Sequence, residues 1–595
     1  MKKIILVAAS LLAISAVFVA CTKKEAHGPN YKLVRVPLGD DVKTLDPANA
    51  YDTVSLSVMP LAVESLFQYA FLKSPLELEP LLAESMPEVS KDKKTYTIKI
   101  KKGVMFQDDP AFANGKGREL KAKDFVYAWK RLLIPALQSN GTWIFEDKVV
   151  GYTELKKAIA EDKTKSIEER LAADFEGMKA VDDYTIQIKL IQPYPQLLHV
   201  LAMGFGAPVA KEVTDKYGHE GLNERMVGTG PYVLKQNIRG SKIILVKNPS
   251  FRGEKFPSAG DAKAKEAGML ADAGKALPFT DEIQFQIFKE EQPSWLQFQK
   301  GNLEVSGIPK DNFSTAVRAG NLSPDLSAKG IQLTKGEEPA IWYLNFNMKD
   351  KLLGSNINLR KAIVRAVDRD YMIDLFLNGR GVKATSVIPR DIAGYTARKE
   401  VIGDFNLVEA KKYLAKAGYP EGKGLPVIRY DLRGASTSSR QQADYIVKAL
   451  DQIGVKIQVE VNTFPAYLEK EKNGNLQFFM GGWVADYPDP ENFLQLLYGK
   501  NASPGPNSSN WKNAEFDKLY EKVAAMTPSK ERTELVRKAE QIAFDDAVWS
   551  MLYYPIRYDL FHAWVKNYRP NPLILNDLKY MDVDLAKKKE LENKF

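Results

Sequence analysis

The sequence predicts an α/β protein with mixed sheets, on three observations. Four segments alternate apolar and polar residues with a period of two, as strands with one buried face do, at residues 96–100, 184–190, 283–287 and 457–461. Segments of helical periodicity lie among them, at 123–133, 359–377, 408–417, 439–453, 514–525 and 530–544. Interleaved strands and helices are typical of α/β folds. The length of 595 residues is enough for about three or four domain-sized units.

The N-terminus has the pattern of an export signal. Lys2 and Lys3 precede an apolar stretch, 4–20, that ends at Cys21, the only cysteine of the chain. This cysteine resembles the acylated cysteine of bacterial lipoproteins, although Phe18 stands where leucine is usual. We expect a signal peptide at 1–20, a lipid anchor on Cys21 and a short tether at 21–30. An ordinary secretory signal with a chance cysteine is the alternative.

Composition narrows the possible partners. Charged residues make up 27% and hydrophobic residues 45% of the chain, which is ordinary globular usage. The net charge is +9, but the lysines are spread along the chain and no nucleic-acid motif accompanies them. We therefore expect no nucleic-acid partner. No later apolar segment approaches the roughly 18 residues of a membrane span.

Motifs for catalysis and metal binding are missing. The four histidines, His27, His199, His219 and His562, are far apart and form no pair at helical ligand spacing. No nucleophile elbow or Walker loop is present. The sequence thus predicts a protein without metal or cofactor that is not an enzyme.

Irregular structure is expected in several segments. Residues 108–119 and 252–277 are rich in turn-forming or small residues and predict surface loops or insertions. Gly228-Thr229-Gly230-Pro231 predicts a tight turn, because its proline lacks the N–H of a phosphate loop. The charged tail 584–595 is compatible with a short helix or a frayed end.

The most informative segment is 480–492, where an apolar run ends beside two glycines and a carboxylate. Gly481 and Gly482 lack Cβ and would allow another backbone to approach closely. Asp486 follows the predicted end of the strand. Two interpretations are open: Asp486 and Asp489 cap a turn before their prolines, or Asp486 is a binding group.

Short motifs spread over residues 31–570 resemble, in order, those of family 5 extracellular solute-binding proteins, the receptors of peptide ABC transporters, nearest to oligopeptide-binding members. The motifs lie at 42–47, 64–67, 82–84, 96–106, 121–131, 227–232, 247–252, 358–362, 417–420 and 480–492. Each alone is weak, but their common order is specific for the family.

The resemblance implies a two-lobed periplasmic-binding-protein fold with mixed sheets, a discontinuous first domain and an extra inserted domain, three domains in all. The expected boundaries are 31–63, 215–341 and 550–595 for domain I, 64–214 for the inserted domain II, and 342–549 for domain III. The lobes would close over a ligand between them. The implied function is a monomeric, lipid-anchored receptor that delivers oligopeptides to the permease and ATPase of an ABC importer.

The resemblance also implies a peptide site. Asp486 would pair with the peptide α-ammonium group, the backbone of Gly482 and Val484 would bond the peptide main chain, and Trp483 would form a wall. Further cleft residues would be Tyr51, Thr53, Trp342, Tyr343, Asn345 and Trp143. For the four aromatic residues among these six, packing in the core or hinge is the alternative. No basic group for the peptide C-terminus can be matched.

Other functions are compatible with the sequence. Relatives within the family bind dipeptides, cell-wall peptides, haem, nickel or oligosaccharides, and the scarcity of histidine argues against a metal. A sensor or chaperone-like lipoprotein that binds extended segments is an alternative of another class. A hydrolase acting on peptides or the cell wall is a third.

Overall fold

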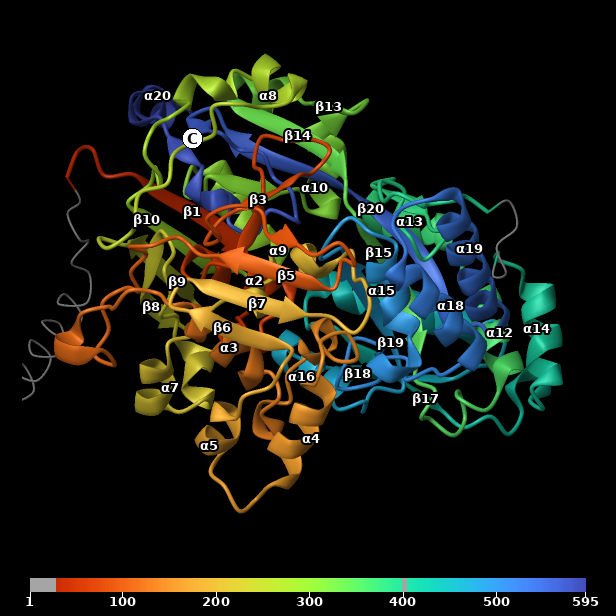
Figure 1. The fold of residues 1–595 in the computed structure, drawn as a ribbon. Helices are drawn as coiled ribbons and strands as arrows, with labels where there is room; N and C mark the ends of the chain where they lie inside the picture. The colour runs from red at the N-terminus through yellow and green to blue at the C-terminus, as the bar shows by residue number, and fades with distance from the viewer. Residues whose placement is uncertain (1–27, 399–403) are drawn as a thin grey trace, which may run out of the picture.

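The computed structural model describes residues 28–398 and 404–595, which form mixed sheets surrounded by helices (Figure 1). Cys21, the expected lipidation site, lies outside the described residues. Within the described ranges, no helix has both the length and the apolar character needed to cross a membrane.

A four-stranded sheet lies in the first half of the chain, in the order β1-β10-β9-β8. Its strands are β1 (Leu33–Leu38), β10 (Glu282–Ile287), β9 (Lys242–Lys247) and β8 (Tyr232–Ile238). β1 runs parallel to β10 although the two are far apart in sequence, and the other pairs are antiparallel. The chain start is thereby fixed against a segment almost 250 residues later.

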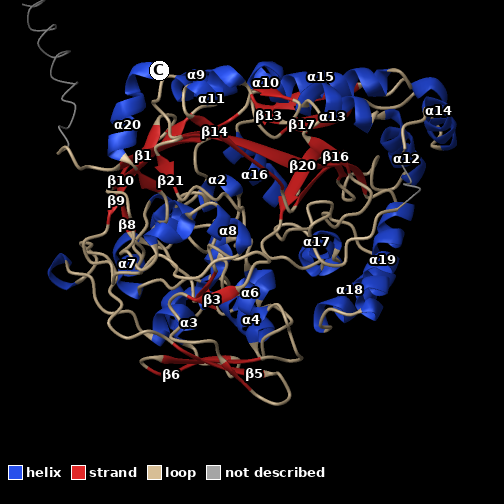
Figure 2. Ribbon diagram, turned by 90° about the horizontal axis from the view of Figure 1, so that it is seen from above, coloured by secondary structure: helices blue, strands red, loops and turns tan. Residues whose placement is uncertain are grey.

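A larger, eight-stranded sheet is built from strands between residues 305 and 562. It contains β11 (Val305–Gly307), β14 (Ile331–Glu337), β15 (Ala340–Phe346), β16 (Gly381–Lys383), β17 (Ile428–Leu432), β18 (Ile457–Val461), β19 (Phe478–Val484) and β20 (Trp549–His562). The 14-residue strand β20 pairs with β14 at one end and with β15 and β16 at the other (Figure 2). One long strand therefore joins β14 to β15 and β16 in a single sheet.

A third sheet, β4-β5-β7-β6, is built from residues 88–189. Its strands are β4 (Glu88–Val89), β5 (Thr95–Lys99), β6 (Met178–Asp182) and β7 (Thr185–Lys189). Figure 2 shows it at the lower edge of the view, apart from the larger sheet. This sheet lies within the segment expected for domain II, and β17 to β19 lie within that expected for domain III, while β15 crosses the expected boundary at 341/342.

Helices cover these sheets. They are α2 (Thr53–Leu56), α3 (Ala122–Arg131), α4 (Tyr152–Glu161), α5 (Ile167–Ala172), α6 (Leu197–Val200), α7 (Lys211–Tyr217), α8 (Ala262–Glu266), α9 (Glu291–Gln299), α10 (Lys310–Ala316), α11 (Pro324–Ala328), α12 (Ile357–Ala366), α13 (Arg369–Leu377), α14 (Leu407–Lys416), α15 (Thr437–Asp451), α16 (Phe464–Lys472), α17 (Glu491–Leu494), α18 (Ala514–Ala525), α19 (Lys530–Asp545) and α20 (Leu585–Leu591). Short strand pairs complete the fold: β2 (Phe67–Tyr69) with β3 (Leu78–Pro80), β12 (Val317–Arg318) with β13 (Asn321–Leu322), and β21 (Val565–Lys566) with β22 (Asp582–Val583).

All four segments of period two form strands, as predicted: β5, β7, β10 and β18. The helical segments are also confirmed, with one difference. The segment 359–377 forms two helices, α12 and α13, rather than one. The break lies before Asp368, whose side chain caps the start of α13 by accepting a hydrogen bond from Tyr371 N–H. The insertion 252–277 is not a loop throughout, since it contains α8. The tail forms α20.

The predicted tight turn at Gly228 is a close approach of two backbones. A Cβ at Gly228 would lie 2.1 Å from the carbonyl oxygen of Ala62. Gly230 N–H donates to the same oxygen at 2.9 Å. The glycines are therefore required by packing of the backbone.

Candidate functional site

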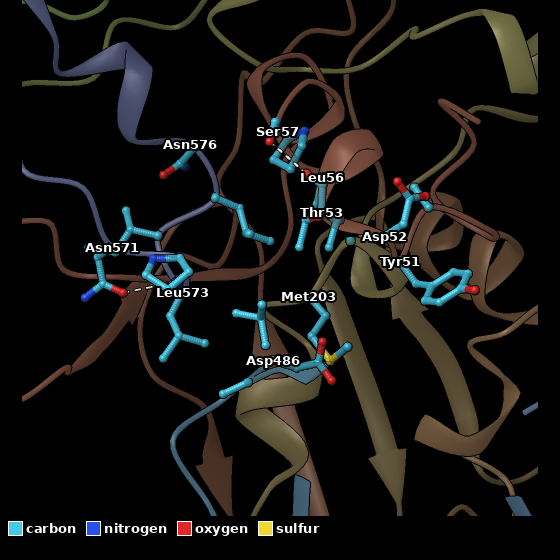
Figure 3. Close-up of a pocket in the computed structure, with 18 of the residues that line it drawn as sticks. Tyr51, Asp52, Thr53, Leu56, Ser57, Met203, Asp486, Asn571, Leu573 and Asn576 are labelled. Carbon is cyan, nitrogen blue, oxygen red and sulfur yellow. Dashed lines mark hydrogen bonds between the residues drawn. The ribbon is translucent and has the colours of Figure 1, made fainter. Parts of the chain in front are cut away.

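A cavity of about 630 Å³ is lined by segments from distant parts of the chain. This volume is within the roughly 300–1,000 Å³ of ordinary ligand pockets. Figure 3 shows residues 51–57 along one side and Asn571, Leu573 and Asn576 on another, with Asp486 and Met203 below them. The end of β19 and the ring of Trp342 on β15 also line the cavity.

Asp486 follows β19 and turns a half-buried carboxylate toward the cavity (Figure 3). Its Oδ2 accepts a hydrogen bond from Asn492 Nδ2 at 2.8 Å. Within the described ranges no lysine, arginine or histidine forms an ion pair with it. Burial raises the pKa of Asp486 to about 7, although the bond from Asn492 acts in the opposite direction. The site therefore holds a carboxylate that lacks a cation.

Asp489 has the role of the turn residue. Its Oδ1 accepts a hydrogen bond from Glu491 N–H at 2.8 Å, and both its oxygens pair with Arg532 at 2.6 and 2.9 Å. The turn interpretation is therefore confirmed for Asp489. It does not describe Asp486, whose carboxylate accepts from the Asn492 side chain and from no other described residue.

The glycines before Asp486 accommodate aromatic rings. In the antiparallel pairing of β15 with β19, Trp342 lies opposite Gly482 and Tyr343 opposite Gly481. A Cβ at Gly482 would lie 2.7 Å from the Trp342 ring, and one at Gly481 would lie 2.6 Å from the Tyr343 ring. The expectation that another backbone approaches these missing Cβ positions is thus wrong, because side chains fill that space.

The other, in-plane edge of β19 is open beside the cavity. Ala485 N–H donates to Pro339 on the β15 side, so the alternate peptide groups of Gly482 and Val484 face the opposite side. There the neighbouring strand β17 pairs with β19 only at Phe478 and Phe479 and ends at Leu432. The backbone of β19 therefore continues past its neighbour.

Arg433, which directly follows β17, is a cation that sequence reasoning missed. Its guanidinium lies over the rings of Trp342 and Phe464, 5.2 and 5.1 Å from their centroids, and it lines the cavity. In the part of the chain that the structure describes, it has no hydrogen-bond or ion-pair partner. The sequence feature that could have identified Arg433 is its position directly after a buried strand.

Asn492 is the second residue that sequence reasoning missed. Besides holding the Asp486 carboxylate, its Oδ1 accepts from Trp483 Nε1 at 3.0 Å and from Asp486 N–H at 2.9 Å. Its side chain is completely buried. One carboxamide thus orients both the carboxylate and the indole.

Eight of the ten predicted ligand residues border the cavity: Tyr51, Thr53, Trp342, Tyr343, Gly482, Trp483, Val484 and Asp486. Asn345 and Trp143 do not. The Asn345 carboxamide is buried and bonded to Ser508 and Ser509 at 2.9 and 2.6 Å. Trp143 is buried in the hydrophobic core that includes the third sheet. Both side chains are occupied by packing, which corrects these two expectations.

The lining of the cavity contains further carboxylates. Burial raises the pKa of Glu471, which the nearby Arg433 opposes. Burial also raises the pKa of Asp577 to about 7, with Arg557 opposing. Among the described residues, no group of three or more metal-ligating side chains could hold a metal ion.

Comparison with known proteins shows relatives of similar length. The chain is 27% identical to the dipeptide-binding protein of Escherichia coli K12, with 90% of this chain and 91% of that protein covered. It is 26% identical to the oligopeptide-binding protein OppA of Bacillus subtilis 168, covering 93% and 94%, and 26% identical to heme-binding protein A of Haemophilus influenzae, covering 91% and 90%.

Solved structures share the fold. The periplasmic binding protein DppA from Helicobacter pylori, in complex with the peptide STSA, superposes with a TM-score of 0.75 at 24% identity, covering 93% of this chain and 99% of that one. Listeria monocytogenes OppA bound to peptide gives the same TM-score at 21% identity, with the same coverage. These likenesses show the two-lobed fold of periplasmic binding proteins.

The family model of the bacterial extracellular solute-binding proteins, family 5 Middle, matches residues 77–505, well over half of the chain. The members compared above are solute-binding proteins rather than enzymes. This chain belongs to the bacterial extracellular solute-binding proteins of family 5.

Proposed function

We propose that this protein is a receptor that binds oligopeptides in the cavity between its lobes and delivers them to an ABC importer. The observation that carries the proposal is the open edge of β19, which ends beside the unpaired carboxylate of Asp486. An extended peptide can add to such an edge as a strand. Relatives named for dipeptides and oligopeptides support a peptide as the ligand.

Asp486 binds the peptide α-ammonium group in this proposal. A half-buried carboxylate without a cation is unfavourable, as its raised pKa indicates. A bound ammonium group supplies the missing charge. Removing one partner of such a buried pair typically costs roughly 3–5 kcal/mol.

The backbone of Gly482 and Val484 bonds the peptide main chain. Both residues line the cavity and present their peptide groups to the open side of the strand. Main-chain bonds are independent of side-chain identity. The rings of Trp342, Trp483 and Tyr51 then contact the ligand as walls.

Arg433 binds a ligand carboxylate in this proposal. The pairing of Asp431 with Phe479 places Arg433 level with Gly481, five residues before Asp486. At about 3.3 Å per residue, the two Cα positions are roughly 16 Å apart along the strand. A ligand that reaches both side chains is therefore extended along the edge of β19.

The remaining parts of the proposal concern location and assembly. Cys21 carries a lipid anchor after removal of residues 1–20, and 21–30 form a tether. The chain is a monomer of three domains, with domain I at 31–63, 215–341 and 550–595, domain II at 64–214, and domain III at 342–549. If a Cys21→Ala variant stays in the membrane fraction, the anchor is wrong.

Calorimetric titration with tri- to pentapeptides tests the ligand. We expect free peptides to bind and their N-acetylated forms to bind at least tenfold more weakly, since acetylation removes the ammonium charge. Equal binding of both forms contradicts the role of Asp486. If no peptide binds, the proposed ligand class is wrong. Loss of peptide uptake in cells lacking the protein, restored by the intact gene, tests delivery.

A further inference from the structure

One wall of the cavity is an irregular segment, residues 568–578. Figure 3 shows Asn571, Leu573 and Asn576 from this segment across the pocket from Thr53 and Leu56. The segment has no strand, and its only helical part is the start of a single 3-10 turn at Asp577–Lys579. Something other than a sheet must hold it in place.

The insertion 252–277 packs against this segment as a closed unit. Leu277 N–H donates to Glu254 O at 2.7 Å, and Phe256 N–H donates to Lys275 O at 2.8 Å. Gly274 N–H returns to Phe256 O at 3.0 Å. These backbone hydrogen bonds join the two ends of the insertion.

Three acids of the insertion each pair with a base that lies in the wall segment or next to it. Glu254 pairs with Lys579 at 2.8 Å, Asp261 with Arg569 at 2.5 Å and Asp272 with Lys566 at 3.1 Å. The order is reversed along the two segments, as expected for chains that lie antiparallel. The insertion therefore forms ion pairs with residues at both ends of the wall segment.

The innermost of these pairs leads directly to the cavity. Lys579 is fully buried and also donates to Gln68 Oε1 at 2.9 Å. Asn576 Nδ2 donates to the same oxygen at 2.9 Å. Both Gln68 and Asn576 line the cavity. Burial would raise the pKa of Glu254, but Lys579 and Arg252 outweigh it and hold that pKa below its ordinary value.

A fourth pair reaches the neighbouring wall. Arg252, the first residue of the insertion, donates to both oxygens of Glu64 at 2.6 and 3.0 Å. Glu64 lines the cavity and is buried. The insertion thus supports two segments of the cavity wall from outside.

We propose that the insertion 252–277 positions the cavity wall 568–578 and thereby determines which ligand side chains the site accepts. The nature of the ligand rests on the proposed function. In the proposed function, main-chain binding belongs to β19, and in the described part of the chain no hydrogen bond or ion pair joins the insertion to this strand. The wall presents side chains such as Asn571 and Leu573, so a displaced wall alters discrimination between side chains more than basal binding.

The test removes the outer part of the insertion. Residues 257–273 are replaced by Asn-Gly. The hydrogen bond from Gly274 N–H to Phe256 O then closes a two-residue turn between these two residues. The probes are Ala-Ala-Ala and the three peptides in which one alanine is replaced by phenylalanine. Hydrogen exchange of the free protein is followed over 568–578.

We expect the variant to bind Ala-Ala-Ala within threefold of the wild type, while the spread of Kd values among the phenylalanine peptides contracts at least threefold. Exchange over 568–578 should become faster. An unchanged spread and unchanged exchange in a folded variant overturn the proposal, as does a wild-type protein that binds all four peptides equally. A wild type that binds none contradicts the proposed function instead, and exchange still tests the positioning.

A milder variant guards against misfolding. Asp261→Asn with Asp272→Asn removes two ion pairs but leaves an asparagine able to cap α8. The matched control is Glu146→Gln, which breaks the ion pair with Lys156 in α4, remote in sequence from the wall. The double variant should change the spread of Kd values and the control should not. If both change it equally, the effect is not one of positioning.

Discussion

Asn492 holds the carboxylate of Asp486 from behind: its Nδ2 lies 2.8 Å from Asp486 Oδ2, while its Oδ1 accepts the backbone N–H of the same aspartate at 2.9 Å. The carboxylate is therefore oriented before any ligand arrives. Such preorganisation reduces the entropy that binding must overcome.

Replacing Asn492 should separate positioning from folding. Asn492→Ala removes the one side-chain donor that the described residues offer to Asp486, and it leaves the Trp483 indole without its acceptor. We expect peptide affinity to fall about tenfold and the pH midpoint of binding to rise, because this donor lowers the pKa of Asp486. Asn345→Ala, which disturbs a buried amide outside the cavity, should lower stability without moving that midpoint. Equal midpoints in both variants contradict the prediction.

Peptide affinity should increase as pH rises toward neutrality. Asp486 has a pKa of about 7 in the free protein and must be ionised to bind an ammonium group. Below this value the affinity is expected to fall by up to about tenfold per pH unit. Above about pH 8 it should fall again, because the peptide α-amino group then loses its proton. Titration in two buffers of different ionisation enthalpy should show proton release near pH 6. The Asp486→Asn variant and N-acetylated peptides should show no such dependence.

The same group has the opposite effect on the stability of the free protein. Its folded-state pKa of about 7 is above its ordinary value of 3.8, so its contribution to stability decreases as pH rises from about 4 to 7. Asp486→Asn removes that penalty. At pH 8 its thermal midpoint should equal or exceed that of the wild type. A midpoint lowered by several degrees would instead indicate a structural role as a turn cap.

Arg433 should distinguish ligands by their C-terminus. Arg433→Met removes the unpaired cation, so we expect peptides with a free carboxylate to bind at least tenfold more weakly and amidated peptides to be unaffected. Arg429→Met is the control, since this residue lies on the same strand but is paired with Asp431 at 3.3 Å. A uniform loss for both kinds of peptide assigns Arg433 to packing.

Adding a methyl group at Gly482 should force the Trp342 ring to move. The new Cβ would lie 2.7 Å from that ring, and overpacking of this kind typically costs about 1–3 kcal/mol. The free energy of unfolding from chemical denaturation measures it. Gly336→Ala on β14 is the matched control, because its Cβ would meet nothing within 4 Å. Comparable losses in the two variants would show that strand propensity, rather than the ring, is responsible.

Sequence periodicity predicted the helices and strands better than it predicted which residues each side chain contacts. Residues 457–461 alternate and form β18 with the same bounds, because a period of two is a local property of the strand. The segment 359–377 was predicted as one helix, since the apolar spacing of α12 and α13 happens to continue across Asp368. The capping residue Asp368 marks the boundary between the two helices, and periodicity alone does not detect it.

The site was predicted in part for the same reason. Asp486 follows a strand end that periodicity could locate, and it borders the cavity. Asn345 and Trp143 were expected in the cleft from the family resemblance. Ser508 and Ser509 bond the Asn345 side chain and the hydrophobic core buries Trp143, through tertiary contacts that no local pattern reveals. Asn492 is six residues beyond Asp486 in sequence, and the turn between them brings the two side chains into contact. The sequence pattern did not predict that contact.

The strand β20 also governs the order in which the molecule can fold. It occupies residues 549–562, near the end of the chain, yet it pairs with β14 in one lobe and with β15 in the other. A nascent chain that stops before Trp549 lacks the central partner of both. We therefore expect the lobes to mature together, after synthesis is nearly complete, rather than one after the other from the N-terminus as independent domains do.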